Sequence, residues 1–353
     1  LALADYEQAR KLLEPIWKRE PDKKNYRWQM CGVLYRLGST LLGIGKTTES
    51  MVHIEHAIEL LLRIAPTDQQ GASYNLLLSR VLQLRGDVRD RVGHTADAEH
   101  DYAQSLDIVR GLLKASPSDV QLRRALIDSS YRAIDYWLHL GKLDLAELAA
   151  NQLENTANQL LTSDATNQGH KWRLAGSLQR VGDVMLARGR ADDARKTYQR
   201  ALEIQESLRA QSPDSSRHRD RTVWLWERQG DAASRGAFPK QALLTWGQAL
   251  GLLAELERVD PLNVDVRLGA ARIQRKRALL RYSLIDGWSI DRIGELYGVH
   301  RATAARWINA ARDALGDHVR REAAARMAIP VEEVDSIVQL VHSQIDVSLA
   351  RIL

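Results

Sequence analysis

The chain has 353 residues, of which 44% are apolar and 27% are charged, and its formal net charge is +5. This composition supports a packed core and excludes a disordered chain, and no apolar run approaches the roughly 18 residues of a membrane span. The single cysteine, Cys31, excludes disulfides within the chain and favours a reducing, cytoplasmic location without a signal peptide.

Residues 1–274 carry an internal repeat with a period of 48 residues. The recurring positions are a first glycine (Gly38, Gly86, Gly182, Gly230), a second glycine (Gly45, Gly93, Gly141, Gly189), an alanine (Ala98, Ala146, Ala194, Ala242) and a larger apolar residue (Ile54, Tyr102, Tyr198, Trp246). Three of the first glycines are followed by aspartate. A fixed period of this kind predicts a solenoid, because each unit buries its apolar face only by stacking on its neighbours.

Each unit is predicted to form two antiparallel helices, as residues 181–214 illustrate. The first helix is expected to end near Ala187, and Gly189 supplies the left-handed turn that a side chain would resist. In the second helix, Ala194 and Tyr198 begin a buried stripe with helical spacing. Proline at the end of the unit stops this helix before the next unit begins.

This order of residues resembles the tetratricopeptide repeat, whose ordinary length is about 34 residues. The resemblance covers residues 1–274 and implies an all-α solenoid with an unknown protein or peptide partner in its groove. Lengthened repeats of this kind resemble arrays that accompany bacterial signalling proteins, including Ser/Thr kinases. Residues 1–20 align only with a second helix, so we expect the chain to open in mid-repeat, with upstream sequence missing.

Two lookalike motifs are interpreted as structural. The stretch 43–48 is similar to the end of a phosphate-binding loop, but Thr40 stands where the full pattern needs glycine. His53 and His56 have metal-ligand spacing without the further ligands that a site needs, so we expect solvated or partner-facing histidines. Trp28 is expected to lie in the core. Without a catalytic set, we predict no enzyme activity and no cofactor or metal.

A different pattern follows at residues 275–316. Ser289 is placed to cap a helix whose buried face carries Ile290, Ile293, Leu296 and Tyr297. Gly298 is expected to end that helix with a left-handed turn. The next helix is predicted to bury Ala304 and to show a basic outer face without acidic residues. A short helix, a glycine turn and a basic second helix are typical of domains that insert a helix into the major groove of DNA.

The stretch from Leu284 to Arg312 resembles region 4 of sigma-70 family factors, especially the extracytoplasmic-function type, and the resemblance covers residues 276–353. It implies binding to the upstream element of promoter DNA and contact with the RNA polymerase core. The DNA-binding residues that it implies are His300, Arg301, Ala302, Thr303, Arg306, Asn309 and Arg312. Arg301 is the candidate for a guanine contact, and Thr303 and Arg306 are candidates for phosphate contacts.

Residues 317–353 are predicted to form a helical extension that is amphipathic after Pro330. Its apolar stripe packs on the helix-turn-helix or contacts a second copy or the polymerase, and the first of these is favoured because helices of one domain usually cover each other. A helix near residues 272–280 is expected to serve both the last repeat and the DNA-binding module.

The predicted fold class is therefore all-α, with a tetratricopeptide-like α-solenoid followed by a helix-turn-helix domain. The function predicted from it is a DNA-binding transcription regulator or an atypical sigma factor, because the array stands where sigma region 2 would precede region 4. The alternative is a protein-interaction scaffold of a signalling protein, such as a Ser/Thr kinase tail, without direct DNA function. A steep salt dependence of DNA binding would distinguish the two.

Overall fold

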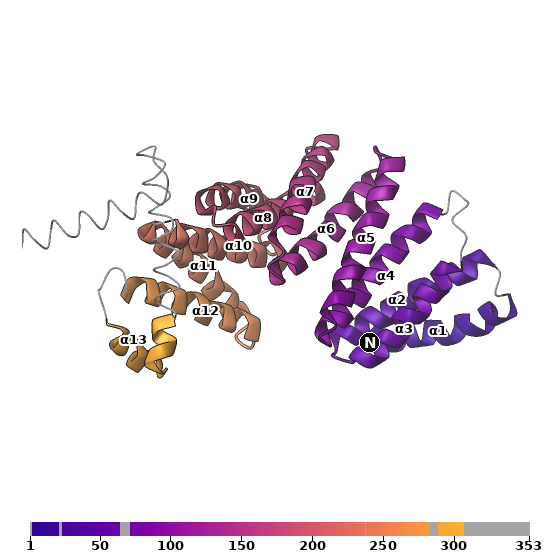
Figure 1. Cartoon of the computed structure of the whole chain (residues 1–353), viewed down its shortest axis with the longest axis horizontal. Helices are drawn as coiled ribbons and strands as arrows, with labels where there is room; N and C mark the ends of the chain where they lie inside the picture. The colour runs from indigo at the N-terminus through magenta and orange to yellow at the C-terminus, as the bar shows by residue number, and fades with distance from the viewer. Residues whose placement is uncertain (1, 21–22, 64–70, 237, 283–288, 307–353) are drawn as a thin grey trace, which may run out of the picture. The chain divides into compact units, whose positions relative to one another are not determined.

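The computed structural model describes residues 2–20, 23–63, 71–236, 238–282 and 289–306, and every regular element in these ranges is a helix (Figure 1). The helices are α1 (Ala2–Arg19), α2 (Lys24–Gly43), α3 (Thr47–Leu62), α4 (Gly71–Arg91), α5 (Thr95–Ala115), α6 (Val120–His139), α7 (Leu143–Ser163), α8 (Gln168–Ala187), α9 (Ala191–Gln211), α10 (Ser216–Arg235), α11 (Pro239–Val259), α12 (Val264–Leu280) and α13 (Ile290–Tyr297). The predicted all-α class is confirmed. None of the described helices is both long and apolar enough to cross a membrane.

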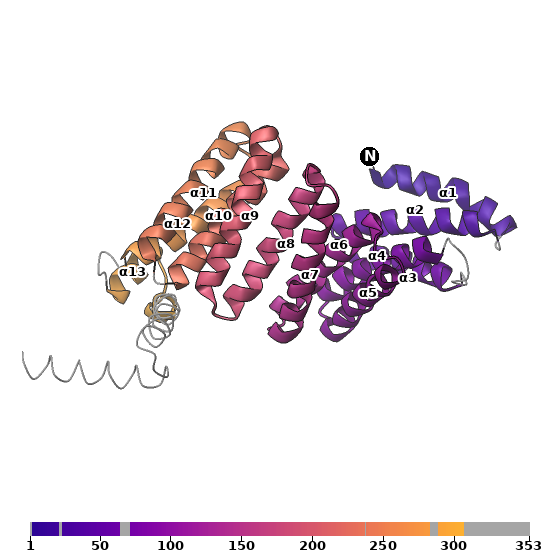
Figure 2. The same cartoon turned by 90° about the horizontal axis from the view of Figure 1, so that it is seen from above.

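The chain divides into two compact units, Leu1–Arg180 and Val181–Leu353, and the division falls inside α8. Within each unit, consecutive helices pack against each other, as α9 to α12 show in Figure 2. The fold of the repeat region is a tetratricopeptide-like solenoid.

In the four repeats that carry it, the second glycine forms the turn between the two helices, as predicted. Gly45, Gly93, Gly141 and Gly189 have φ angles of 81°, 83°, 69° and 76°. These values lie in the left-handed region, which glycine adopts without the steric cost of a Cβ atom. The interpretation of residues 43–48 as a turn is thereby confirmed.

In the four repeats that carry it, the first glycine allows close packing of an aromatic or branched side chain from the next helix. A Cβ atom at Gly182 would lie 2.5 Å from the ring of Tyr198, and one at Gly86 would lie 3.0 Å from the ring of Tyr102. Gly38 faces Ile54 and Gly230 faces Trp246 in the same way. The glycine and the larger residue therefore recur together for one reason, which is that the glycine leaves space for the larger side chain.

The repeat that lies between those of Gly86 and Gly182 exchanges the sizes of these two residues. Ile134 stands on the glycine register and Ala150 on the aromatic register. Both side chains are buried, with exposed fractions of 0% and 2%. A large residue on α6 and a small one on α7 keep the total volume similar, and volume-conserving exchanges of this kind are well tolerated in cores.

We predict that Gly182→Ala destabilises the protein by about 1–3 kcal/mol, because the added methyl group overpacks the ring of Tyr198. The control is Gly247→Ala in α11, where nothing lies within 4 Å of the added atom. That variant gains up to about 1 kcal/mol of helix propensity. Urea unfolding of both variants checks the prediction, which fails if the two variants are equally stable.

Aspartates at one register connect each repeat to the next. Asp87 accepts a hydrogen bond from Tyr102 at 2.7 Å and Asp183 accepts one from Tyr198 at 2.6 Å. Each aspartate also pairs with a cation 45 residues later in the same unit. The pairs are Asp87–Arg132, Asp135–Arg180 at 2.6 Å, Asp183–Arg228 at 3.4 Å and Asp231–Lys276 at 2.7 Å. The Gly–Asp dipeptide thus positions both the ring and the following repeat.

The remaining candidate residues of the first unit lie in its core or against α1. Cys31 is fully buried, and burial raises the pKa of its thiol to about 12, in agreement with a structural role. His56 packs edge-on against Trp17 with ring centroids 5.9 Å apart. His53 is also partly covered, and burial lowers its pKa. Of the expected solvated or partner-facing histidines, neither is fully solvated, because α1 covers part of this face. No three described His, Cys, Asp or Glu side chains could hold a metal ion together.

Candidate nucleic-acid interface

The last helix of the array is also the first helix of the C-terminal module. Ile273 of α12 belongs to the buried cluster that contains Trp246 of α11. Leu279, two turns further along α12, packs against the cluster of Ile293 in α13, and Figure 1 shows α13 beside α12. The expectation that one helix serves both parts is confirmed, and the predicted domain boundary at residues 274/275 falls inside it.

The short helix α13 begins and ends as predicted. The Ser289 Oγ accepts a hydrogen bond from the Arg292 amide at 3.2 Å, which satisfies one of the free amides at the start of the helix. Gly298 ends the helix with a φ of 61°. Ile293 is fully buried, but Leu296 is 53% exposed, contrary to the prediction. At 3.6 residues per turn, Leu296 lies beside the buried stripe and not in it.

The two helices of the motif approach each other closely at Gly294. A Cβ atom there would lie 3.1 Å from the Val299 carbonyl oxygen and 3.7 Å from the Cβ of Ala304, which is fully buried. Sequence reasoning missed this residue. The available signal was a glycine inside an eight-residue helix, where it costs about 1 kcal/mol relative to alanine and needs a packing reason.

The described start of the second helix exposes most of the predicted contact residues. His300, Arg301, Ala302 and Arg306 are exposed and Thr303 is half-buried. The His300 Nδ1 accepts a hydrogen bond from the Ala302 amide at 3.2 Å, so this ring caps the helix. An Arg306 Nη donates to the Thr303 hydroxyl at 3.2 Å, which brings these two predicted phosphate contacts together. The predicted residues Asn309 and Arg312 lie outside the described residues.

An acidic residue from the first helix holds Arg301. The Arg301 Nη1 lies 2.9 Å and 2.8 Å from the two carboxylate oxygens of Asp291. Residues 299–312 themselves contain no acid, as predicted, but Asp291 adds a negative charge to this face from α13 across the turn. Both side chains are more than half exposed, at 67% and 54%, and exposed pairs of this kind contribute at most about 1 kcal/mol. Such a pair opens readily when a stronger anion approaches.

Comparisons with known proteins find one match for the C-terminal module and others for the fold of the repeat array. A model of the homeodomain-like domain family matches residues 270–316, beginning inside α12. No curated protein matches the chain. The repeat region is similar to the crystal structure of BtubC from P. vanneervenii, with 14% identity, a TM-score of 0.57, and coverage of 72% of this chain and 91% of that one. The apo form of RapI gives 10% identity, a TM-score of 0.52, and coverage of 90% and 81%. Identities this low show the fold alone.

Proposed function

We propose that this protein is a DNA-binding transcription regulator that recognises promoter DNA through its C-terminal helix-turn-helix. The observation that carries the proposal is the homeodomain-like match at residues 270–316 over a left-handed glycine turn at Gly298. The helix after that turn presents Arg301 and Arg306 to solvent. A helix with this start and this charge suits the phosphates and base edges of the major groove.

The resemblance of residues 276–353 to sigma region 4 supports a narrower form of the proposal. In this form the DNA is the upstream promoter element and the RNA polymerase core is a partner. The repeat array then binds a separate protein or peptide, as solenoids do on their inner surface. The chain would act as an atypical sigma factor or as a regulator that acts at the same promoter element.

A second candidate is a protein-interaction scaffold whose helix-turn-helix binds protein. The pairing of Arg301 with Asp291 favours it, because this pair removes one positive charge from the face that DNA would meet. The two candidates differ in their response to salt, since only phosphate contacts release counterions from DNA.

The test is selection of duplexes from a randomised DNA library by the full chain, followed by affinity measurements at several salt concentrations. We expect an enriched sequence and an affinity that falls linearly on a log–log plot, by about 0.9 per phosphate contact. Selection without an enriched sequence, or binding indifferent to salt, would refute DNA recognition and favour the scaffold.

We predict that Asp291→Asn tightens DNA binding about threefold to tenfold and steepens its salt dependence. The variant removes a negative charge near the DNA and releases Arg301 for a phosphate or base. Asp265→Asn, at an exposed site in the first turn of α12, is the control and should leave affinity unchanged. Weaker binding by Asp291→Asn would mean instead that the carboxylate orients Arg301 for contact. Fluorescence anisotropy with the selected duplex measures both variants.

A further inference from the structure

Three neighbouring hollows in the first unit are lined by residues of α2, α4 and α6 and by Tyr102 of α5. Their volumes are about 320, 210 and 270 Å³. The first hollow lies on α2 and α4 and shares Tyr35 and Arg80 with the second. The second shares Asp87 and Arg132 with the third, which extends to α6. We call these three hollows the groove.

The first hollow combines an apolar wall with unpaired positive charge. Trp28 is partly buried against Tyr74, with ring centroids 5.0 Å apart, and its side chain lines the hollow. The prediction of Trp28 as a core residue is therefore correct for only part of its surface. Arg36 and Arg80 also line it, and neither makes an ion pair with any described residue. No carboxylate lines this hollow.

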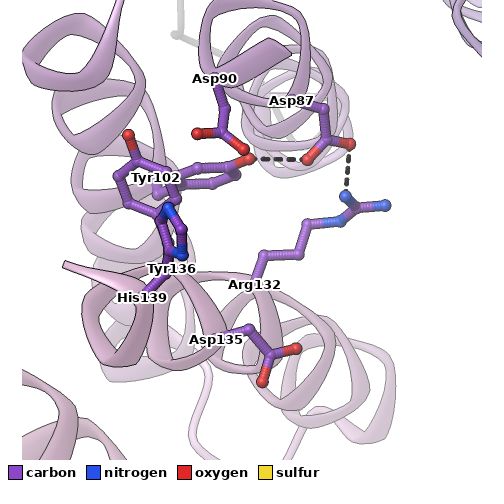
Figure 3. Close-up of a pocket in the computed structure, with 7 residues that line it drawn as sticks. All are labelled: Asp87, Asp90, Tyr102, Arg132, Asp135, Tyr136 and His139. Atoms are coloured by element: carbon purple, nitrogen blue, oxygen red, sulfur yellow. Dashed lines mark hydrogen bonds and ion pairs between the residues drawn. The ribbon is translucent and has the colours of Figure 1, made fainter. Parts of the chain in front are cut away.

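The second hollow adds positive charge that the protein does not neutralise. The Arg91 Nη1 donates to the Leu42 carbonyl oxygen at 2.7 Å, a neutral partner that leaves the charge in place. Asp87 is the single acidic residue that lines this hollow. It already accepts hydrogen bonds from Tyr102 and Arg132, as Figure 3 shows.

The third hollow reverses the sign of the charge. Asp87, Asp90 and Asp135 line it together with Arg132 and His139 (Figure 3). Asp135 is paired at 2.6 Å with Arg180, which does not line the hollow. Asp90 is exposed and makes no ion pair with any described residue. The groove is thus positive from α2 to Arg80 of α4 and mildly negative at its other end, where Asp90 of α4 lies. A ligand with uniform negative charge, such as nucleic acid, would be repelled at that end.

We infer that the groove binds an extended acidic peptide, with carboxylates against Arg36 and Arg80 and an apolar side chain against Trp28. This inference deepens the proposed role of the array and rests on it. Each hollow is near or below the lower limit of about 300 Å³ for small-molecule pockets. A row of such hollows matches successive side chains of an extended peptide. Guanidinium groups bind carboxylates with paired hydrogen bonds, which makes arginine selective for them.

The test is selection of random dodecapeptides displayed on phage, using the full-length protein, followed by synthesis of the enriched sequence. Its affinity is measured by fluorescence anisotropy for the wild type, for Arg36→Gln/Arg80→Gln and for Lys11→Gln/Lys114→Gln. The control pair removes the same charge from exposed sites of the first unit that do not line the groove. Circular dichroism establishes that all three proteins fold equally well.

We expect an enriched sequence with at least two acidic residues, binding at least tenfold weaker to the Arg36→Gln/Arg80→Gln variant and unchanged for the control. An enriched sequence without Asp or Glu, no enrichment, or equal affinity for both variants would overturn the inference. Displacement of the peptide by single-stranded oligo-dT, lost in the Arg36→Gln/Arg80→Gln variant, would also overturn the inference. That result would identify the groove as a nucleic-acid channel. Promoter selection does not involve these arginines, so a failure of peptide binding and a failure of DNA recognition give different results.

Discussion

Replacing both Arg301 and Arg306 by alanine is expected to reduce the affinity for the selected promoter duplex by roughly thirtyfold to a thousandfold, or about 2–4 kcal/mol. Both side chains are exposed at the start of the helix that follows Gly298, so their removal leaves the core intact. A base contact supplies about 1–3 kcal/mol of this loss and phosphate contacts supply the rest.

The single variants separate the two roles. Arg301→Ala is expected to relax the preference at one base pair, whereas Arg306→Ala is expected to weaken binding to all duplexes and to reduce the salt slope by about 1. Arg258→Ala/Arg267→Ala removes two exposed charges from α11 and α12 and serves as the control. Wild-type affinity in the Arg301→Ala/Arg306→Ala variant would remove both residues from the proposed interface.

Glu227→Ala is expected to destabilise the second unit by about 3 kcal/mol, because it removes the buried carboxylate that pairs with Arg272 and leaves Lys276 with Asp231 alone. Glu227 accepts hydrogen bonds from Arg272 at 2.7 Å and from Lys276 at 2.7 Å. Its side chain is 7% exposed. This loss of stability is at the lower end of the range for buried ion pairs, because the Arg272 side chain is 49% exposed and can be hydrated when Glu227 is removed.

The same residue predicts a dependence of stability on pH. Burial raises the pKa of Glu227, but hydrogen bonds from Arg272 and Lys276 outweigh it, so the pKa is lowered overall. A lowered carboxyl pKa stabilises the fold above the unfolded value of about 4.5, and this contribution is lost as the pH falls below it. Urea unfolding of Glu227→Gln should show a weaker dependence on pH below that value. Glu255→Gln, at an exposed site on α11, is the control and should match the wild type.

The consequence for function follows from the position of these contacts on α12. Glu227 and Asp231 hold the part of α12 that precedes the contact of Leu279 with the module. A partner that shifts α12 would shift the helix-turn-helix with it. Glu227→Ala is therefore also expected to change DNA affinity in the full chain, although this residue is not in the DNA-binding face. Free rotation of the array and the module in small-angle scattering would count against this coupling.

Local chemistry made the helical solenoid and its turns predictable from the sequence. Gly189 predicts a left-handed turn and Ser289 predicts the start of a helix. Both predictions depend only on the backbone conformation and hydrogen bonds of a few neighbouring residues. The 48-residue period then extended these local assignments along the array.

The candidate sites were less predictable because they depend on how helices meet. The pair of Asp291 and Arg301 crosses a turn, and the exposure of Leu296 depends on which side of α13 is covered. The groove forms where side chains of successive repeats leave space, and its charge depends on which acids are already paired. The spacing of residues within one helix does not predict contacts between side chains of different helices.

The exchange of Ile134 and Ala150 has a consequence for how the array assembles. Repeats of the same architecture can mispair during folding, because a helix can pack against the equivalent helix of another repeat. A helix that carries Ile134 has no room for the ring of Tyr198 or Trp246, and the helix that carries Ala150 would leave a void against a glycine. The middle of the array therefore accepts only its own partner helix, which fixes the pairing of the helices on both sides of it.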